Sequence, residues 1–404
     1  MDHVWIEAGG VTSPEGFMAG AVYAGVKTYG PEPRFDVGIL ASTEPATCAG
    51  VFTKNKVVGA PVELCRERVK LGRGRAVVVN SGCSNVAMGD VGRRDARAMA
   101  SIAAECLGVP EAEVLVASTG VIGRPLPMDK IGRAIRETRL SPAGGIEFAR
   151  AIMTTDTVPK QRAVKLMVDG VTYPIGGAAK GSGMVHPDMA TVLCFLTTDA
   201  PAKADYLQAL LRDVADRSLN MIDVDMDTST SDTMLVFANG AAGGSVVKRG
   251  HPAEEPLRRA IEAVAIELAK DLARDGEGAK TLIEVRVEGA RSLEDARIAA
   301  RTVASSPLVK TMVTGRDPNL GRVMMAIGRS GARVDVDSTS VFIGEKCAFE
   351  RGSPTEIPHD EIKRALDSSE VLIRVDLGLG GGAATAWGCD LTEEYVRING
   401  SYTT

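Results

Sequence analysis

Short runs of β-branched and aliphatic residues alternate along the whole chain with longer stretches of helical periodicity, and this alternation most constrains the fold. The apolar runs span 75–79, 114–119, 163–168, 191–197, 281–287 and 371–377. The amphipathic stretches span 95–107, 203–218, 254–275, 292–306 and 359–369. Short apolar runs indicate buried or half-buried strands, and apolar residues three or four apart indicate helices with one face on a sheet. We therefore expect an α/β protein, a layered helix-on-sheet sandwich.

A glycine-rich loop between Gly240 and Gly250 precedes the longest amphipathic stretch and is a candidate boundary between two lobes. No long polar linker occurs anywhere in the 404 residues. Domains joined by a flexible linker need such a segment, so the sequence predicts two intimately packed lobes instead.

The charge balance argues against several classes of partner. The chain has 47 Lys and Arg against 52 Asp and Glu, a net charge of −5, with no basic block. Nucleic acid and anionic membranes are therefore not expected as partners. Seven scattered cysteines without C-x-x-C spacing are typical of reduced thiols. With neither a signal-peptide pattern nor a long apolar run, the sequence predicts a cytoplasmic protein.

Two motif-like patterns do not fit the sites that they imitate, and the histidines form no metal-binding pattern. Residues 378–383 imitate a dinucleotide fingerprint, but too few residues follow for the required β-α-β unit, so they indicate glycine-lined strand ends. Asp223, Asp225 and Asp227 imitate a calcium loop, yet Thr228 stands where that loop needs glycine. The four histidines lie far apart in the sequence. We therefore expect no metal site.

The sequence has no G-x-S-x-G elbow of a serine hydrolase and no Walker loop for phosphate binding. Thr191 is the candidate nucleophile that remains. It begins the apolar run 191–197 shortly after the glycine-rich segment 177–183. A threonine hydroxyl becomes reactive when its own α-amine serves as the base, which requires cleavage between Ala190 and Thr191. The hydroxyl would attack the Ala190 carbonyl, and water would hydrolyse the resulting ester. The same pattern also fits an ordinary loop-to-strand junction, so the residues alone leave both interpretations open.

The segment KGSGMVHPDMAT at 180–191 resembles the self-cleavage motif of the glutamate N-acetyltransferase (ornithine acetyltransferase) family of arginine biosynthesis. Further blocks occur in the family order across nearly the whole chain: NSG (80–82), ASTGVIG (117–123), AIMTTD (151–156), DTSTSDT (227–233), GEGA (276–279), DPNLGR (317–322) and AWGCDLTEEYVRIN (386–399). The resemblance implies an α/β sandwich related to other self-processing acyl-transfer enzymes. It also implies cleavage into an α chain (1–190) and a β chain (191–404), a heterotetramer of two α and two β chains, and no cofactor.

The implied activity is transfer of an acetyl group from N-acetylornithine to glutamate by a ping-pong scheme with an acetyl-Thr191 intermediate. By the same resemblance, Thr119 and Gly120 form the oxyanion hole. The positions that match the family's substrate-binding residues are Thr154, Lys180, Thr191, Glu277, Asn399 and Thr404. Lys180 and Glu277 are expected to meet the carboxylate and the ammonium of the substrate. Because Thr404 ends the sequence, its use as a ligand implies that the C-terminal tail folds back over the site.

This sequence also departs from the family pattern. Asp188 stands where many relatives have Asn, and its extra carboxylate is expected either to raise the pKa of the new α-amine or to slow cleavage, which is still expected to occur. Leu320 replaces a usual Trp, and NSGCSNVAMG at 80–89 differs from the usual block, so the resemblance implies the chemistry but does not extend to the fine substrate contacts.

Two alternatives remain at this stage. One is a self-processing amidohydrolase or aminopeptidase with the same N-terminal threonine, in which water takes the acyl group. The other is a binding protein that keeps the scaffold and is never cleaved. The sequence also leaves open whether acetyl-CoA is a second acetyl donor.

Overall fold

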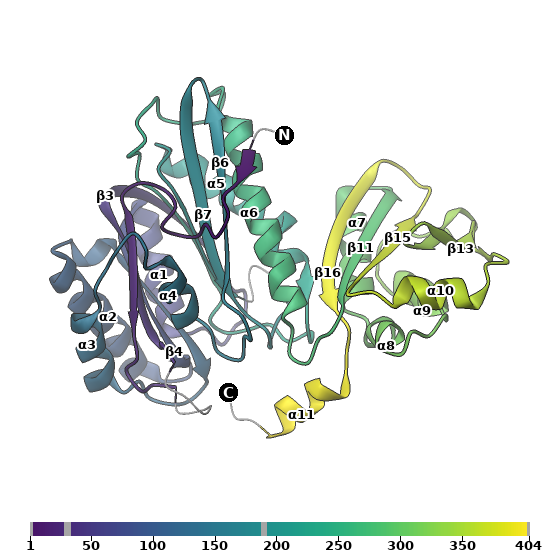
Figure 1. Cartoon of the computed structure of the whole chain (residues 1–404), viewed down its shortest axis with the longest axis horizontal. Coiled ribbons are helices and arrows are strands. Elements are labelled where there is room, and N and C mark those ends of the chain that lie inside the picture. The colour runs from purple at the N-terminus through teal and green to yellow at the C-terminus, as the bar shows by residue number, and fades with distance from the viewer. Residues whose placement is uncertain (1–2, 28–33, 187–191, 402–404) are drawn as a thin grey trace.

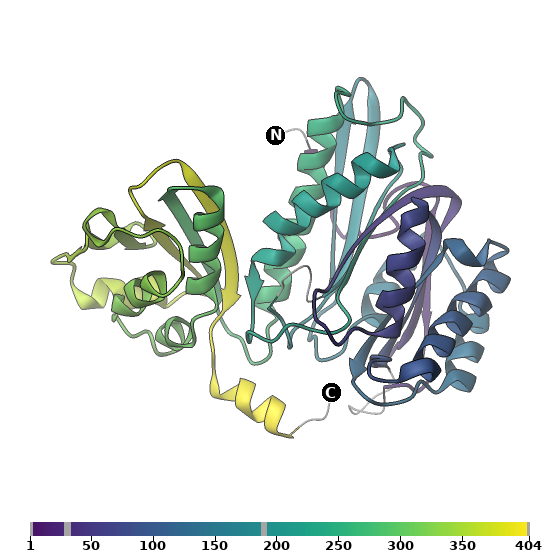
Figure 2. The same ribbon diagram turned by 180° about the vertical axis from the view of Figure 1, so that it is seen from behind.

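The computed structural model describes residues 3–27, 34–186 and 192–401, which form two lobes side by side (Figures 1 and 2). The first lobe contains the large sheet. Its strands, in pairing order, are β1 (His3–Trp5), β6 (Lys160–Val168), β7 (Val171–Lys180), β8 (Leu193–Thr198), β10 (Thr233–Ala238), β3 (Val37–Phe52), β4 (Arg73–Cys83) and β5 (Val114–Val121), with β2 (Phe17–Val22) also paired to β3.

Helices cover both faces of the large sheet. The face around β2 to β5 carries α1 (Ala60–Arg68), α2 (Gly89–Leu107), α3 (Met128–Glu137) and α4 (Gly145–Ala151), and the opposite face carries α5 (Ala204–Arg217) and α6 (Glu254–Arg274). Residues of β8 alternate between the two cores: Phe195 packs edge-on against Phe148 of α4, while Cys194 and Leu196 face α5 and α6. This burial on both sides explains why the strand begins with four apolar residues in a row, Leu193 to Leu196.

The second lobe is built on a sheet with the order β14 (Ser353–Pro354), β13 (Lys346–Glu350), β12 (Ser340–Ile343), β15 (Glu370–Asp376), β11 (Leu282–Ala290), β16 (Gly382–Cys389) and β9 (Ile222–Asp223). Its helices are α7 (Leu293–Ala304), α8 (Pro307–Gly315), α9 (Gly321–Gly328) and α10 (His359–Leu366). Strand β16 begins at Gly382, as expected for glycine-lined strand ends.

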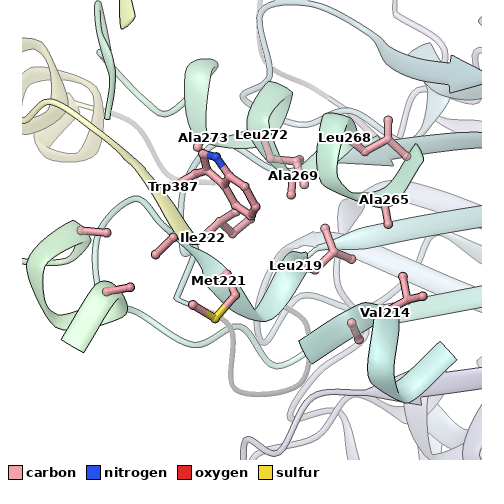
Figure 3. Packing of buried hydrophobic residues seen from close by; sticks show 14 of the residues in the cluster. Val214, Leu219, Met221, Ile222, Ala265, Leu268, Ala269, Leu272, Ala273 and Trp387 are labelled. Atoms are coloured by element: carbon pink, nitrogen blue, oxygen red, sulfur yellow. The ribbon is translucent and has the colours of Figure 1, made fainter. Parts of the chain in front are cut away.

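The two lobes share one apolar core, as the prediction of intimately packed lobes requires. Trp387 of β16 packs beside Leu272 and Ala273 of α6, and Ile222 of β9 lies next to them (Figure 3). All four side chains are nearly inaccessible to solvent. The interface between the lobes is therefore continuous with the protein interior.

The predicted lobe boundary at Gly240–Gly250 is wrong. This loop joins β10 to α6, and α6 packs on β6 and β7 of the same large sheet. Strand β9 joins the sheet of the second lobe earlier in the chain, and the remaining strands of that sheet all follow α6, beginning with β11 at Leu282. Glycine in the loop marks a turn on the surface of one lobe, because tight turns need glycine whether or not they separate lobes.

Helix α11 (Glu393–Ser401) follows β16 and extends from the second lobe back beneath the first (Figure 1). None of its residues is buried. Of the helices in the described residues, none has the length and apolar character needed to span a membrane.

Candidate active site

A cavity of about 330 Å³ lies where β5 and β7 end and β8 begins, with Tyr395 and Asn399 of α11 on its rim. Six of the nine residues predicted for the site and the cleavage point line it: Thr119, Gly120, Thr154, Lys180, Glu277 and Asn399. The other three, Ala190, Thr191 and Thr404, lie outside the described residues. Segments far apart in the sequence therefore converge on one cavity.

The described residues on both sides of the predicted cleavage point also line this cavity. They include Gly183 and Met184 before it and Val192 and Leu193 after it. Met184 has a φ of 55°, in the left-handed region that residues with a side chain rarely occupy. Asp225 holds this conformation by accepting hydrogen bonds from the backbone N–H groups of Met184 and Val185, at 2.6 and 2.8 Å.

Lys180 is the last residue of β7 and directs its Nζ to the hydroxyl of Thr154, at 3.2 Å. Burial lowers the pKa of Lys180, although the nearby carboxylates of Asp156, Asp232 and Glu277 raise it. Among the described residues, the hydrogen-bond partner of this partly buried ammonium is a neutral hydroxyl, which suits Lys180 to bind an anion.

Asp156 orients the backbone around Lys180 and was not predicted as a site residue. Its carboxylate accepts hydrogen bonds from the backbone N–H groups of Thr154 and Gly181, at 3.0 and 2.7 Å. It also pairs with Lys160 at 2.7 Å, and Lys160 in turn pairs with Asp275. Burial alone would raise the pKa of Asp156, but the charges of Lys160 and Lys180 lower it below its ordinary range. Asp156 therefore stays ionised and positions Thr154.

Glu277 lies at the junction of the lobes and faces the cavity. Its Oε2 accepts a hydrogen bond from Nδ2 of Asn399 over 2.7 Å, which ties α11 to the site. Gly183 lies so close that a Cβ there would come within 2.4 Å of the Glu277 carboxylate. Any side chain at 183 would therefore push the Glu277 carboxylate out of this position.

Thr119 and Gly120 lie near the end of β5, where its pairing with β4 becomes irregular. Gly120 has a φ of 120°, and a Cβ there would lie 2.5 Å from the backbone of Gly82. Within the described residues, the hydroxyl of Thr119 has no hydrogen-bond partner, so it is free to bind a ligand in the cavity.

Asp232 is a second cavity residue that sequence reasoning did not assign. It is 2% exposed, and in the described part of the chain its Oδ2 has no hydrogen-bond partner. Burial raises the pKa of Asp232 well above its ordinary range, although Ser229 and Lys180 act in the opposite direction. Asp225 belongs to the D-x-D-x-D repeat and Asp232 to the block DTSTSDT. These two patterns were the signals in the sequence that could have indicated both residues.

No three His, Cys, Asp or Glu side chains are placed to hold one metal ion, within residues 3–27, 34–186 and 192–401. His186 instead pairs with Asp223 at 2.8 Å, and Lys310 pairs with the same carboxylate at 2.9 Å. The absence of a metal and of a cofactor in the reaction remains a prediction.

A model of the ArgJ family matches residues 18–404. This chain belongs to the ArgJ family. The arginine biosynthesis bifunctional protein ArgJ of Symbiobacterium thermophilum is 51% identical over 402 residues, which cover 99% of this chain and all of that protein. Its counterpart in Dehalococcoides mccartyi is 48% identical over 396 residues, with 98% of both chains covered.

A crystal structure of arginine biosynthesis bifunctional protein ArgJ from Bacillus halodurans is similar with a TM-score of 0.51 and 40% identity. The match covers 52% of this chain and 98% of that chain. These comparisons confirm the family of arginine-biosynthesis enzymes expected from the sequence, and with the two layered sheets they confirm the fold class. The roles of the individual site residues stay predictions.

Proposed function

We propose that this chain is an acetyltransferase that moves the acetyl group of N-acetylornithine to glutamate through an acetyl ester on Thr191. Membership of the ArgJ family supports an enzyme of arginine biosynthesis. One observation supports the residue assignments. The six described site residues line one cavity, and Val192, the first described residue after Thr191, lines the same cavity.

In the first half-reaction, the free α-amine of Thr191 takes the proton of its own hydroxyl, and Oγ attacks the acetyl carbonyl of N-acetylornithine. The Thr119 hydroxyl and the Gly120 N–H stabilise the oxyanion. The bond from the carbonyl carbon to the ornithine nitrogen then breaks. The protonated α-amine gives its proton to that nitrogen, and ornithine leaves.

In the second half-reaction, the amine of glutamate attacks the acetyl ester, the new C–N bond forms, and the bond to Thr191 Oγ breaks. The proton released by the attacking amine returns to Oγ through the Thr191 α-amine. Ornithine carries a distal ammonium and glutamate a distal carboxylate. The cavity holds a cation, Lys180, and several carboxylates, of which Glu277 is the one proposed to meet the ammonium, so it offers a partner to the distal group of either substrate.

The mature enzyme forms by self-cleavage between Ala190 and Thr191, which gives an α chain of 1–190 and a β chain of 191–404. The left-handed backbone at Met184, held by Asp225, is local strain in the segment before the cleavage point. The half-length chain in the Bacillus halodurans crystal structure also agrees with cleavage near the middle of the precursor. The two chains assemble as a heterotetramer of two α and two β chains in the cytoplasm.

Intact-mass spectrometry of the purified protein, before and after incubation with N-acetylornithine without glutamate, tests this proposal. We expect two chains that divide before Thr191, and a gain of one acetyl group on the second chain that glutamate removes. A Thr191→Ala variant should remain one chain. A single unmodified chain of 42.4 kDa in the wild type would show that Thr191 is a structural junction.

Glutamate dependence separates this activity from a hydrolase. In an amidohydrolase or aminopeptidase, water removes the acetyl group, so ornithine release continues without glutamate. In the proposed enzyme, only one equivalent of ornithine is released per active site until glutamate is added.

A further inference from the structure

Acetyl transfer moves two protons in each half-reaction, and the Thr191 α-amine carries only one of them. The hydroxyl proton of Thr191 converts the amide nitrogen of N-acetylornithine to a neutral amine, and a second proton is needed before ornithine leaves as an ammonium ion. Glutamate arrives as an ammonium ion and must lose one proton before its nitrogen can attack. A group in the cavity that gives a proton in the first half-reaction and takes one in the second would serve both steps.

Asp232 directly precedes β10 and lines the catalytic cavity. Backbone hydrogen bonds fix its place on both sides. Its carbonyl accepts from the N–H of Thr53 at 3.1 Å, and the N–H of the next residue, Thr233, donates to the carbonyl of Val192 at 3.0 Å. Since Val192 directly follows Thr191 in the sequence, Asp232 lies next to the segment that begins just after the proposed nucleophile.

One oxygen of the Asp232 carboxyl group is left without a contact. Ser229 hydrogen-bonds to the group, but Oδ2 has no hydrogen-bond partner in the part of the chain that the structure describes. The side chain is 2% exposed, so bulk water does not solvate it. An unpartnered buried carboxylate is unfavourable, whereas a protonated carboxyl group has a hydrogen that it can donate to a ligand.

Burial keeps this proton on Asp232 when the cavity is empty. It raises the pKa of Asp232 well above its ordinary range, and the opposing effects of Ser229, Lys180 and Thr53 are smaller. A carboxyl group with a raised pKa both gives and takes a proton near neutral pH, which is what a general acid and base requires.

The other carboxylates of the cavity have different contacts. Asp225 accepts two backbone N–H groups of the segment before the cleavage point, and Glu277 accepts the side-chain amide of α11. Asp227 is exposed to solvent. Within the described residues, Oδ2 of Asp232 is therefore the buried carboxylate oxygen of this cavity that lacks a partner and remains for a substrate amine.

We propose that Asp232 is a further catalytic residue, the proton carrier between the two half-reactions. This inference rests on the proposed function, since Asp232 acts on the amines that acetyl transfer releases and consumes. In the first half-reaction, protonated Asp232 gives its proton to the freed amine of ornithine, which leaves as an ammonium ion. The Asp232 carboxylate then takes a proton from the ammonium of glutamate, and the resulting amine attacks the acetyl ester. Asp232 loses one proton and gains one in each turnover.

Two reagents that need no proton carrier isolate this step in a full-length Asp232→Asn variant. p-Nitrophenyl acetate releases p-nitrophenolate, which leaves without a proton, and hydroxylamine is already a neutral amine at about pH 7. We expect p-nitrophenyl acetate to acetylate the variant, and hydroxylamine to deacetylate it, at nearly wild-type rates. Acetylation by N-acetylornithine and deacetylation by glutamate should each slow at least about a hundredfold, because general acid–base catalysis typically contributes about 10²–10⁴. Intact-mass spectrometry of quenched samples follows the acetyl group.

The pH dependence of deacetylation by glutamate is a second readout, which a purely structural role would not change. Without a base, only glutamate that is already a free amine reacts, so the rate in Asp232→Asn should rise in proportion to that fraction between about pH 7 and about pH 8. The wild-type rate should rise less steeply. The other charged side chains that line the cavity, Lys180, Asp225, Asp227 and Glu277, are the same in both proteins, so the difference reports Asp232.

Two further variants complete the test. Asp232→Glu keeps a carboxyl group and should recover most of the rate with glutamate at about pH 7. Asp337→Asn removes an exposed carboxylate of the second lobe that does not line the cavity, and it should keep wild-type rates with all four reagents.

Equal losses with all four reagents in Asp232→Asn would show a structural role, and an uncut Asp232→Asn chain would assign Asp232 to the cleavage instead. Either result would overturn the inference, as would unchanged rates with N-acetylornithine and glutamate. Each of these results leaves the proposed acetyl transfer intact. A wild type that neither N-acetylornithine nor p-nitrophenyl acetate acetylates would refute the proposed function itself, and the role of Asp232 with it.

Discussion

Asn399 donates a hydrogen bond from Nδ2 to Oε2 of Glu277 over 2.7 Å, and so joins the C-terminal helix of the second lobe to the catalytic cavity. A hydrogen bond to a charged group is worth about 1.5–3 kcal/mol, so Asn399→Ala should lower kcat/KM by about one to two orders of magnitude. The free energy of unfolding should fall by no more than this one hydrogen bond contributes, because α11 buries no residue. Steady-state kinetics and urea unfolding measure the two effects.

Arg397→Ala is the matched control for Asn399→Ala. Arg397 lies on the same helix, its side chain is 75% exposed, and it pairs with Glu394 within α11. Its replacement should leave kcat/KM near the wild-type value. Equal losses in the two variants would mean that α11 acts through its position as a whole and not through the contact with Glu277.

Gly183→Ala is expected to impair the substrate site without unfolding the protein. The added Cβ would lie 2.4 Å from the Glu277 carboxylate, the end of a flexible side chain that can move aside. Movement of Glu277 breaks its contact with Asn399, so KM for N-acetylornithine should rise by at least about tenfold. Gly315→Ala, where a Cβ meets nothing within 4 Å, is the control. A KM unchanged in Gly183→Ala would show that Glu277 does not bind substrate.

Thr119→Ala removes the proposed side-chain donor of the oxyanion hole. The loss of one such donor typically lowers kcat by about 10²–10³, and KM should change little because the oxyanion forms only during the reaction. Thr119→Ser keeps a hydroxyl and should recover most of the rate. A rise in KM with unchanged kcat would instead assign Thr119 to ground-state binding.

The fold was largely predictable because its core elements have strong periodicity. All six predicted apolar runs coincide with strands, and the five amphipathic stretches coincide with α2, α5, α6, α7 and α10. β3 escaped prediction because Glu44 and Pro45 interrupt its apolar pattern, where the pairing with β4 shifts register between Ala41 and Ala46. Proline is tolerated there because an irregular position does not need its N–H.

The candidate site was predictable only through the resemblance to a family. Thr154 and Asn399 have no distinguishing local pattern, and α11 lacks the apolar stripe that reveals most helices. Asp156 and Asp225 were missed because a carboxylate that accepts backbone N–H groups has no characteristic sequence spacing. Such residues are recognised only when folding brings distant segments together.

Asp199 is expected to make stability depend on pH. It is 2% exposed, and burial raises its pKa to about 6 although the backbone N–H of Glu15 hydrogen-bonds to it. Because an unfolded aspartate titrates near 3.9, the folded protein holds this proton more tightly, and the free energy of unfolding falls as pH rises from about 4 to about 6.

Asp199→Asn removes the buried charge and keeps an acceptor for the Glu15 N–H. At pH 8 the variant should be more stable than the wild type by about 1–3 kcal/mol, and at pH 4 the difference should vanish, because the wild-type carboxyl is then protonated. Urea unfolding at both pH values measures this. Asp337→Asn, at an exposed position, should have the same small effect at each pH. Destabilisation by Asp199→Asn at pH 8 would show that the ionised carboxylate is needed by the fold.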